Sequence, residues 1–168
     1  MSNVSSLLEI VSTLAIVGSL IFAGVQVNLA RRQRQRETAI QLMQSFRTPE
    51  IVAGITTLID LPAGLSKADL QARYGDRLDN LLLLLLSIES VGILVQKREV
   101  PIELAEDFFF GPTITGWRKL ERYILDLREE LQVDTPLEYF QFLAEQMIRR
   151  QKRHPSAPAY VAYRDWRP

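Results

Sequence analysis

Cysteine is absent from the 168 residues of this sequence, and histidine occurs once, at His154. Without thiols, the chain can form neither a disulfide framework nor a thiolate metal site. A single histidine excludes the paired-histidine zinc motif, and no glycine-rich segment continues into the Lys-Ser or Lys-Thr of a phosphate loop. No nucleophile and base converge in a recognisable pattern, so we predict no enzyme activity, no cofactor and no metal site.

Positive and negative charges cancel over the whole chain but are unevenly distributed. Residues 31–47 contain five arginines and one glutamate, and residues 48–145 contain nine basic and seventeen acidic residues. Residues 146–168 contain six basic residues and one aspartate. Two basic segments therefore flank an acidic middle, and this pattern is more informative than the net charge of zero.

Charged residues are missing from Ile10 to Ala30, a stretch of 21 positions. A helical membrane span needs roughly 20 apolar residues, and in lipid such a segment must be helical to satisfy its backbone. A cleaved signal peptide would carry basic residues before its apolar core, whereas here the basic run follows it. The positive-inside rule then places the short N-terminus outside and the rest of the chain in the cytoplasm.

Basic residues directly after this stretch are expected to contact the anionic headgroups of the inner membrane. They are Arg31, Arg32, Arg34 and Arg36. Within the stretch, Ala15, Ser19 and Ala23 recur every four residues, which places three small side chains on one helix face. Such faces let two helices approach closely in lipid, so we predict self-association, with chance as the alternative explanation.

Leucine fills positions 81–86, which raises the question of a second span. Glu89 divides the apolar stretch into segments much shorter than a span, and an acidic group at the centre of a span is costly. We therefore predict a core helix that is surrounded by the other helices.

The remaining segments show helical periodicity and no convincing strand. Thr48 and Pro49 are expected to start a helix whose buried face contains Ile51, Ile55, Leu58 and Ile59. Ser66 is expected to cap a short helix that reaches about Arg73. Gly111 is expected to end one helix and Pro112 to open the next, which contains Trp117. Asp134 to Pro136 are expected to cap the last bundle helix.

The predicted fold is all-α, with an N-terminal transmembrane helix that continues into a cytoplasmic helical bundle. The predicted boundaries are a short extracytoplasmic N-terminus (1–9), the transmembrane helix (10–30), a juxtamembrane basic helix (31–47), the cytoplasmic bundle (48–154) and a Pro/aromatic tail (155–168).

The apolar span followed at once by arginines, the segment from 87 to 125 and the segment EYFQFLAEQM (138–147) together resemble a known protein family. It is an uncharacterised bacterial family of small single-span membrane proteins with a helical cytoplasmic domain of unknown function. Glu89, Gly92, Trp117 and the Phe-Leu-Ala-Glu segment are the most specific parts. The resemblance implies the topology and the fold class but no reaction, and the tail lies outside it.

Glu89 is the most interesting acid, because a buried carboxylate is costly unless it is paired or hydrogen-bonded. Arg118, Arg122 or Trp117 is expected to be its partner. The pair could fix how helices pack, or it could act as a proton- or ligand-linked switch.

A second group of acids, Glu103, Glu106 and Asp107, shares one face of a helix near its N-terminus. These carboxylates could bind a divalent cation weakly, but a solvated acidic face near a helix N-terminus is the favoured interpretation.

Basic and aromatic residues crowd the C-terminal end. Arg149, Arg150, Lys152 and Arg153 could contact the membrane surface or the acidic middle of a neighbouring subunit. A nucleic-acid role is not expected, because no reader motif accompanies them. The tail residues Tyr160, Tyr163 and Trp166 are expected to dock against the bundle or a partner.

The sequence thus predicts a membrane-anchored cytoplasmic interaction or scaffold protein, either a homo-oligomer or an accessory subunit of a membrane complex. The alternative is an oligomeric channel or transport component, with Gln26 or Asn28 facing a lumen.

Overall fold

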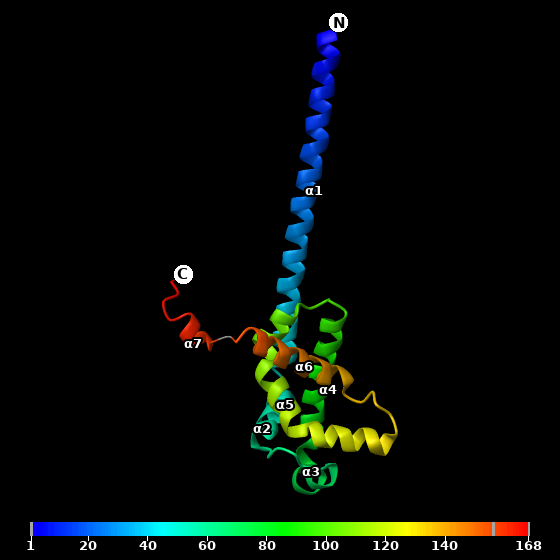
Figure 1. Ribbon diagram of the computed structural model, residues 1–168, viewed down its shortest axis with the longest axis vertical. Coiled ribbons are helices and arrows are strands. Elements are labelled where there is room, and N and C mark those ends of the chain that lie inside the picture. Colours follow the sequence, from blue (N-terminus) through cyan, green and yellow to red (C-terminus); the bar gives the residue numbers. More distant parts are fainter. Residues whose placement is uncertain (1, 156, 168) are drawn as a thin grey trace. The chain divides into compact units, whose positions relative to one another are not determined.

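The computed structural model describes residues 2–155 and 157–167, and within the first helix it leaves out the side chains of residues 2–15, 31, 32, 35, 36, 39, 43 and 45. Every regular element in the described residues is a helix, as the sequence predicts. Figure 1 shows their order. The helices are α1 (Ser2–Ser45), α2 (Pro49–Asp60), α3 (Lys67–Tyr74), the 3₁₀ turn η1 (Gly75–Arg77), α4 (Leu78–Gln96), α5 (Ile102–Leu131), α6 (Glu138–Arg153) and α7 (Ala159–Ala162).

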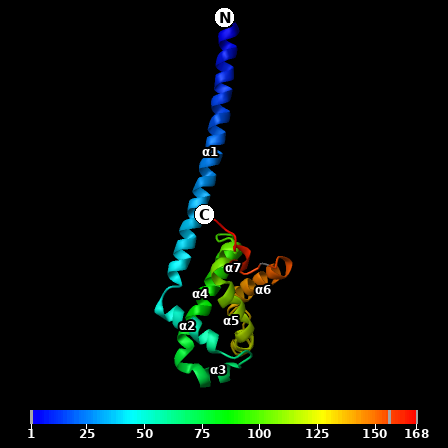
Figure 2. The same cartoon turned by 90° about the vertical axis from the view of Figure 1, so that its left-hand side faces the viewer.

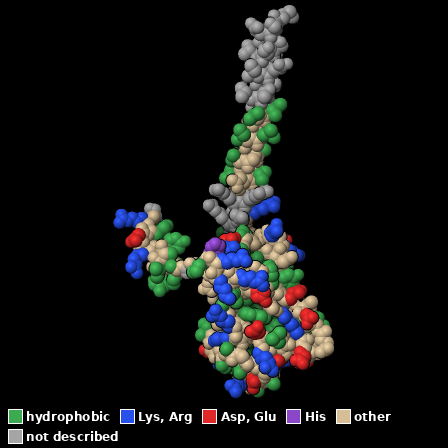
Figure 3. All heavy atoms as spheres, in the orientation of Figure 1, with side chains coloured by type: hydrophobic (Ala, Val, Ile, Leu, Met, Phe, Trp, Pro, Cys, Tyr) green, Lys and Arg blue, Asp and Glu red, His purple; other side chains and the backbone are tan. Residues whose placement is uncertain are grey.

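The chain divides into two compact units, residues 1–42 and residues 43–168. The first unit consists of α1, which continues unbroken through the basic run, in accord with the prediction that the apolar stretch extends into a juxtamembrane helix. The described side chains of its apolar stretch are all exposed, and Figure 3 shows hydrophobic side chains along the face in view. Ile16, Leu20, Ile21 and Phe22 are between 62% and 68% exposed.

Length and composition mark one helical stretch of the described residues, Lys67–Gln96, as able to cross a membrane, and Ile16–Ala30 as apolar but shorter. A buried core helix passes the same test. Leu81, Leu84, Leu85 and Ile88 are at most 1% exposed, so α4 is the core helix of the second unit. The predicted span over 10–30 stays a prediction, because part of it lies outside the described side chains.

Helices α2, α5 and α6 pack on α4 (Figure 2). They do not enclose it. Leu83 and Leu86 are 42% and 55% exposed, so the prediction of a helix surrounded on all sides is wrong in this respect. Three neighbours cover only part of a helix circumference, and one stripe of α4 remains open. The predicted apolar face of α2 needs a similar correction, since Ile59 is 66% exposed while Ile51 and Leu58 are buried.

Helix α5 runs through Gly111 and Pro112, where the sequence predicts a break. Proline lacks the N–H that would bond to the carbonyl four residues earlier, and it usually bends or ends a helix. Here residues on both sides of it, Phe109 and Ile114, are buried in the same core, so tertiary packing outweighs the local preference. The ribbon of α5 changes direction along its length (Figure 1).

Two helix starts in the second unit agree with their predicted caps. The Thr48 hydroxyl accepts the N–H of Ile51 at 3.4 Å, and Pro49 is the first residue of α2. The Ser66 hydroxyl accepts the N–H of Asp69 at 3.1 Å at the start of α3. Each satisfies an N–H that has no partner within its own helix.

Candidate functional site

The start of α6 has no cap from its own segment, contrary to the prediction for Asp134 to Pro136. Leu137 occupies the N-cap position with φ 56°, a left-handed conformation, and makes no side-chain cap hydrogen bond. The first N–H groups of any helix lack partners within the helix. The N–H of Glu138 bonds to the carbonyl of Thr135 at 3.1 Å, and the N–H groups that follow it need an acceptor from elsewhere in the protein.

Glu89 of α4 supplies that acceptor. Its carboxylate accepts the N–H of Phe140, the third residue of α6, from 51 positions earlier in the chain. Phe140 is fully buried, so this N–H has no access to water and would be unsatisfied without Glu89. A carboxylate at a helix N-terminus is also stabilised by the helix dipole. The contact joins two helices through one charged side chain.

Gly92 makes the approach of the two helices possible. It lies three residues after Glu89, on the same face of α4. A Cβ atom built on Gly92 would lie 2.8 Å from the carbonyl carbon of Tyr139, in the first turn of α6. No side chain fits in that space, so glycine is required for the two backbones to lie this close.

The environment of Glu89 favours its neutral form. Burial raises the pKa of the Glu89 carboxyl above its usual 4.5, and the negative charge of Glu138 adds to this effect. The N–H groups of Phe140 and Tyr139 and the charge of Arg128 act in the opposite direction but do not cancel the burial. Glu89 is therefore a half-buried carboxyl that binds a proton more readily than a free glutamate does.

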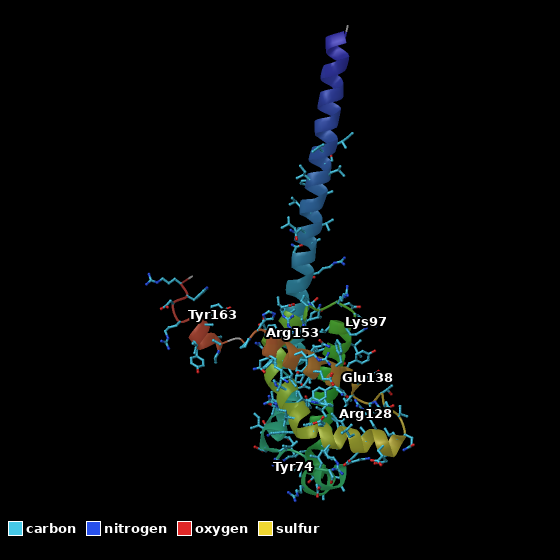
Figure 4. The ribbon with its side chains drawn as sticks, in the orientation of Figure 1. Tyr74, Lys97, Arg128, Glu138, Arg153 and Tyr163 are labelled. Atoms are coloured by element: carbon cyan, nitrogen blue, oxygen red, sulfur yellow. The ribbon has the colours of Figure 1, made fainter. Side chains whose placement is uncertain are left out.

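Arg128 of α5 holds the loop that leads into α6. Its Nε donates to the carbonyl of Pro136 at 3.0 Å, and one terminal nitrogen donates to Oε1 of Gln141 at 2.7 Å. The other terminal nitrogen is buried without a hydrogen-bond partner among the described residues. Figure 4 labels Arg128 and Glu138 at this junction. Glu89, Gly92 and Arg128 together fix the position of α6.

The predicted partners of Glu89 lie elsewhere. Arg118 is exposed, and Arg122 bonds to Asp126 at 2.8 Å within α5. Trp117 is buried and packs against the ring of Phe140, with ring centroids 6.1 Å apart. The sequence therefore brings Trp117 close to the right place, but backbone N–H groups take the role expected of a cation.

Two of the three acids near the start of α5 are paired with one arginine. Arg150 of α6 bonds to Glu103 at 2.8 Å and to Glu106 at 3.0 Å. These residues, Asp107 and His154 line a hollow of about 620 Å³. Within the described part of the chain, no three acidic or histidine residues are grouped to hold a metal ion. The ion pairs of Arg150 join α5 to α6, while Glu103 and Asp107 remain exposed to solvent.

Two further residues that bridge helices were missed by the sequence reasoning. Lys119 Nζ donates to the carbonyls of Leu58 and Ile59 at 3.0 and 2.7 Å, at the end of α2. The Asp126 carboxylate accepts the N–H of Lys67 at 3.1 Å, at the start of α3. Neither contact leaves a local signal, because each joins residues about 60 positions apart.

The residues predicted to contact lipid or a second helix are only partly described. Arg34 of the basic run and Ala23 of the small-residue face are exposed, and Ser19 is exposed as well. The side chains of Arg31, Arg32, Arg36 and Ala15 lie outside the described residues.

The bundle does not cover the three aromatic rings of the tail, and the alternative of docking on a partner stays a prediction. Tyr160, Tyr163 and Trp166 are 79%, 67% and 69% exposed.

The chain matches a known family model. The family model described as "Domain of unknown function (DUF4760)" matches residues 13–147, which is more than half of the chain. This match contains Glu89, Gly92 and α6 up to Met147, and it ends before the C-terminal tail. No curated protein and no solved structure shows significant similarity to the chain.

Proposed function

The chain belongs to the family of the domain of unknown function DUF4760, and we propose that it is a membrane-anchored interaction or scaffold protein without catalysis. In this proposal α1 crosses the inner membrane of a bacterium with its N-terminus outside, and residues 48–154 form a cytoplasmic bundle. The protein acts as a homo-oligomer or as an accessory subunit of a membrane complex.

The observation that carries the proposal is the exposed apolar surface of α1. Its described side chains between Ile16 and Ala30 are all exposed, and none of them is charged. A helix that is apolar all round is unfavourable in water and is expected in lipid or inside a larger assembly. The uncharged stretch from Ile10 to Ala30 has the length of a span.

Orientation follows from the arginines that come after this stretch. Lys and Arg are enriched on the cytoplasmic side of membrane helices, and the segment before Ile10 contains none. Arg34, the described member of this basic run, is exposed and free to contact anionic headgroups. The larger unit then lies in the cytoplasm.

The absence of cysteine makes the topology simple to test. We propose Ser2→Cys and Ala72→Cys as single labelling sites, since Ala72 is exposed in α3. In intact bacterial cells, a membrane-impermeant maleimide should label the first variant and reach the second only after lysis. Equal labelling of both sites, or extraction of the protein from membranes by alkaline carbonate, would overturn the proposal.

Self-association through the face of Ala15, Ser19 and Ala23 is the second part of the proposal. Replacing Ala23 by leucine places a large side chain where two backbones would approach and should lower the native mass in mild detergent. Ile21→Leu, which changes no small position, is the matched control. An unchanged mass in Ala23→Leu, with other proteins copurifying, would instead favour the accessory-subunit form.

A channel is the alternative, and the exposed amide side chains of Gln26 and Asn28 are the observation that favours it. In a symmetric ring, one of these two groups could face a lumen, since residues two apart point to different sides of a helix. Ion flux into liposomes that contain the purified protein should then fall in Asn28→Leu. Absence of flux at every protein density removes the channel alternative and leaves the scaffold proposal in place.

A further inference from the structure

The C-terminal tail, defined here as residues 157–167, is built differently from the bundle that it follows. Its aromatic side chains recur every three residues, at positions 160, 163 and 166. Backbone hydrogen bonds of helix α7 and of the turn after it fix the positions of these aromatic residues. The N–H of Tyr163 donates to the carbonyl of Ala159, and the N–H of Trp166 donates to the carbonyl of Tyr163. The segment is therefore structured while its aromatic side chains remain exposed (Figure 3).

Basic residues accompany these aromatic rings. Arg164 and Arg167 lie beside Trp166, and the one acid in the tail is Asp165. Lys152 and Arg153, just before the tail, are exposed as well. Arg149 and Arg150 differ from them, because both are held in ion pairs with glutamates. The free positive charge of this region is thus concentrated at and next to the tail.

We propose that the tail binds the surface of an anionic lipid bilayer. Tyr and Trp combine an apolar ring with a polar group and are enriched where a membrane meets water. Arginine is attracted to anionic headgroups at the same depth. The positive charge of the segment complements a phosphatidylglycerol surface, whereas docking on the bundle itself is contradicted by the exposure of all three rings.

This inference rests on the proposed function, because anchoring by α1 would make tail binding intramolecular. A short segment with three rings and a few charges binds lipid weakly by itself. When the chain is already anchored in the bilayer, the local concentration of lipid is high and weak binding is sufficient. The tail would then be a second contact with lipid, separate in sequence from the arginines that follow the span.

Trp166 reports the contact directly. The full-length protein is reconstituted in vesicles of equal parts phosphatidylcholine and phosphatidylglycerol with brominated acyl chains, which quench nearby tryptophans. Trp117, the other tryptophan, is 8% exposed inside the second unit, and its signal is subtracted with Trp166→Phe. We expect quenching of Trp166 with anionic lipid and much less with phosphatidylcholine alone.

The arginines are tested while the reporter is kept. Arg164→Glu/Arg167→Glu should weaken the partitioning of the tail into anionic bilayers at least about 25-fold, because each arginine lost lowers the affinity by about fivefold. Arg73→Glu/Lys97→Glu changes the net charge equally at two other exposed positions and should leave quenching unchanged. Quenching that survives Arg164→Glu/Arg167→Glu, or Trp166 that stays open to aqueous iodide in anionic vesicles, overturns the inference. Protection of Trp166 that depends on protein density instead of lipid charge also overturns it, in favour of a second copy.

Failure of membrane anchoring by α1 can be distinguished from failure of lipid binding by the tail. Carbonate extraction reports whether α1 holds the protein in the membrane, irrespective of the tail. If the protein is extracted, vesicles are added to the soluble protein, and flotation of the wild type but not of Arg164→Glu/Arg167→Glu would still support lipid binding by the tail. Absence of flotation even at a lipid excess that compensates for the missing anchor would overturn it.

Discussion

The carboxylate of Glu89 in α4 accepts the N–H of Phe140 in α6, so the N-terminus of one helix is capped by a side chain of another. Gly92, one turn further along α4, allows the first turn of α6 to lie against it. The same principle recurs in the second unit, because Lys119 and Asp126 of α5 bind the end of α2 and the start of α3. Charged side chains from two long helices thus position the shorter ones.

Removing the cap should destabilise the second unit. Glu89→Ala leaves the buried N–H of Phe140 without an acceptor, and loss of an N-cap typically costs about 1–2 kcal/mol. Glu89→Gln retains an acceptor oxygen and should cost less than half as much. Urea unfolding at neutral pH measures both. Equal losses in the two variants would show that the charge, and not the hydrogen bond, is what stabilises α6.

The pH dependence of stability should carry the signature of Glu89. Its pKa is raised by burial in the folded protein, so between 4.5 and the folded-state pKa the folded protein binds more protons than the unfolded chain does. The free energy of unfolding therefore falls as pH rises through this window and is level on either side of it. Glu89→Gln should lack this fall. Unfolding curves for both proteins between about pH 4 and about pH 8, which bracket the titration of a carboxyl with a raised pKa, test the prediction, and parallel curves would contradict it.

Replacement by alanine should have opposite effects on stability at two glycines. Gly92 lies where α4 meets α6, and Gly111 lies in the middle of α5. Gly92→Ala places a Cβ against the backbone of Tyr139, which cannot move aside as a flexible side chain would, and should cost about 1–3 kcal/mol or more. Gly111→Ala meets nothing within 4 Å in the middle of α5 and should stabilise by about 0.5–1 kcal/mol. Thermal unfolding of both variants is the measurement. A stable Gly92→Ala protein would mean that α6 can shift along α4.

Local patterns in the sequence are sufficient to predict most of the helices and the all-α fold class. The hydroxyl caps at Thr48 and Ser66 depend on residues three positions apart, so their patterns are visible in the sequence. The burial of Ile51 and Leu58 in α2 follows from helical spacing in the same way. The break predicted at Gly111-Pro112 was wrong, because burial on both sides of the proline outweighs its preference for a helix start.

The sequence predicts where the candidate site lies but not which groups contact each other in it. Glu89 was recognised as a polar residue in an apolar helix, and its need for a partner followed from the cost of burying a carboxylate. The sequence predicts an arginine or tryptophan side chain, from Arg118, Arg122 or Trp117, as that partner. Backbone N–H groups carry no side-chain signal, and whether those of α6 are capped locally depends on the conformation of Leu137. Contacts between residues about 50 positions apart require the fold.

Replacement of Thr113 by an apolar residue of the same shape should stabilise the protein. Its side chain is fully buried in α5, and its hydroxyl has no hydrogen-bond partner among the described residues. Valine has nearly the same shape and no polar atom to desolvate. Thr113→Val should therefore raise the free energy of unfolding by about 1 kcal/mol. Thr56→Val, at an exposed position whose hydroxyl bonds to the carbonyl of Val52 at 3.0 Å, is the control and should not stabilise to the same extent. A destabilised Thr113→Val protein would show that the hydroxyl has a partner that supports the fold.

Removal of the Lys119 ammonium group should destabilise the last turn of α2. The last carbonyls of a helix lack partners within it, and a cation there also interacts favourably with the helix dipole. Lys119→Met keeps most of the side-chain length but removes the ammonium that binds Leu58 and Ile59. Hydrogen bonds to charged groups contribute about 1.5–3 kcal/mol, and half-exposure of this side chain places the expected loss near the lower end. Lys97→Met, at an exposed position after α4, should change stability by less than about 0.5 kcal/mol. Amide hydrogen exchange locates the effect, because the last turn of α2 should open more often in Lys119→Met while α6 keeps its protection. Increased exchange spread evenly over the second unit would mean that Lys119 stabilises the whole unit and not the end of α2.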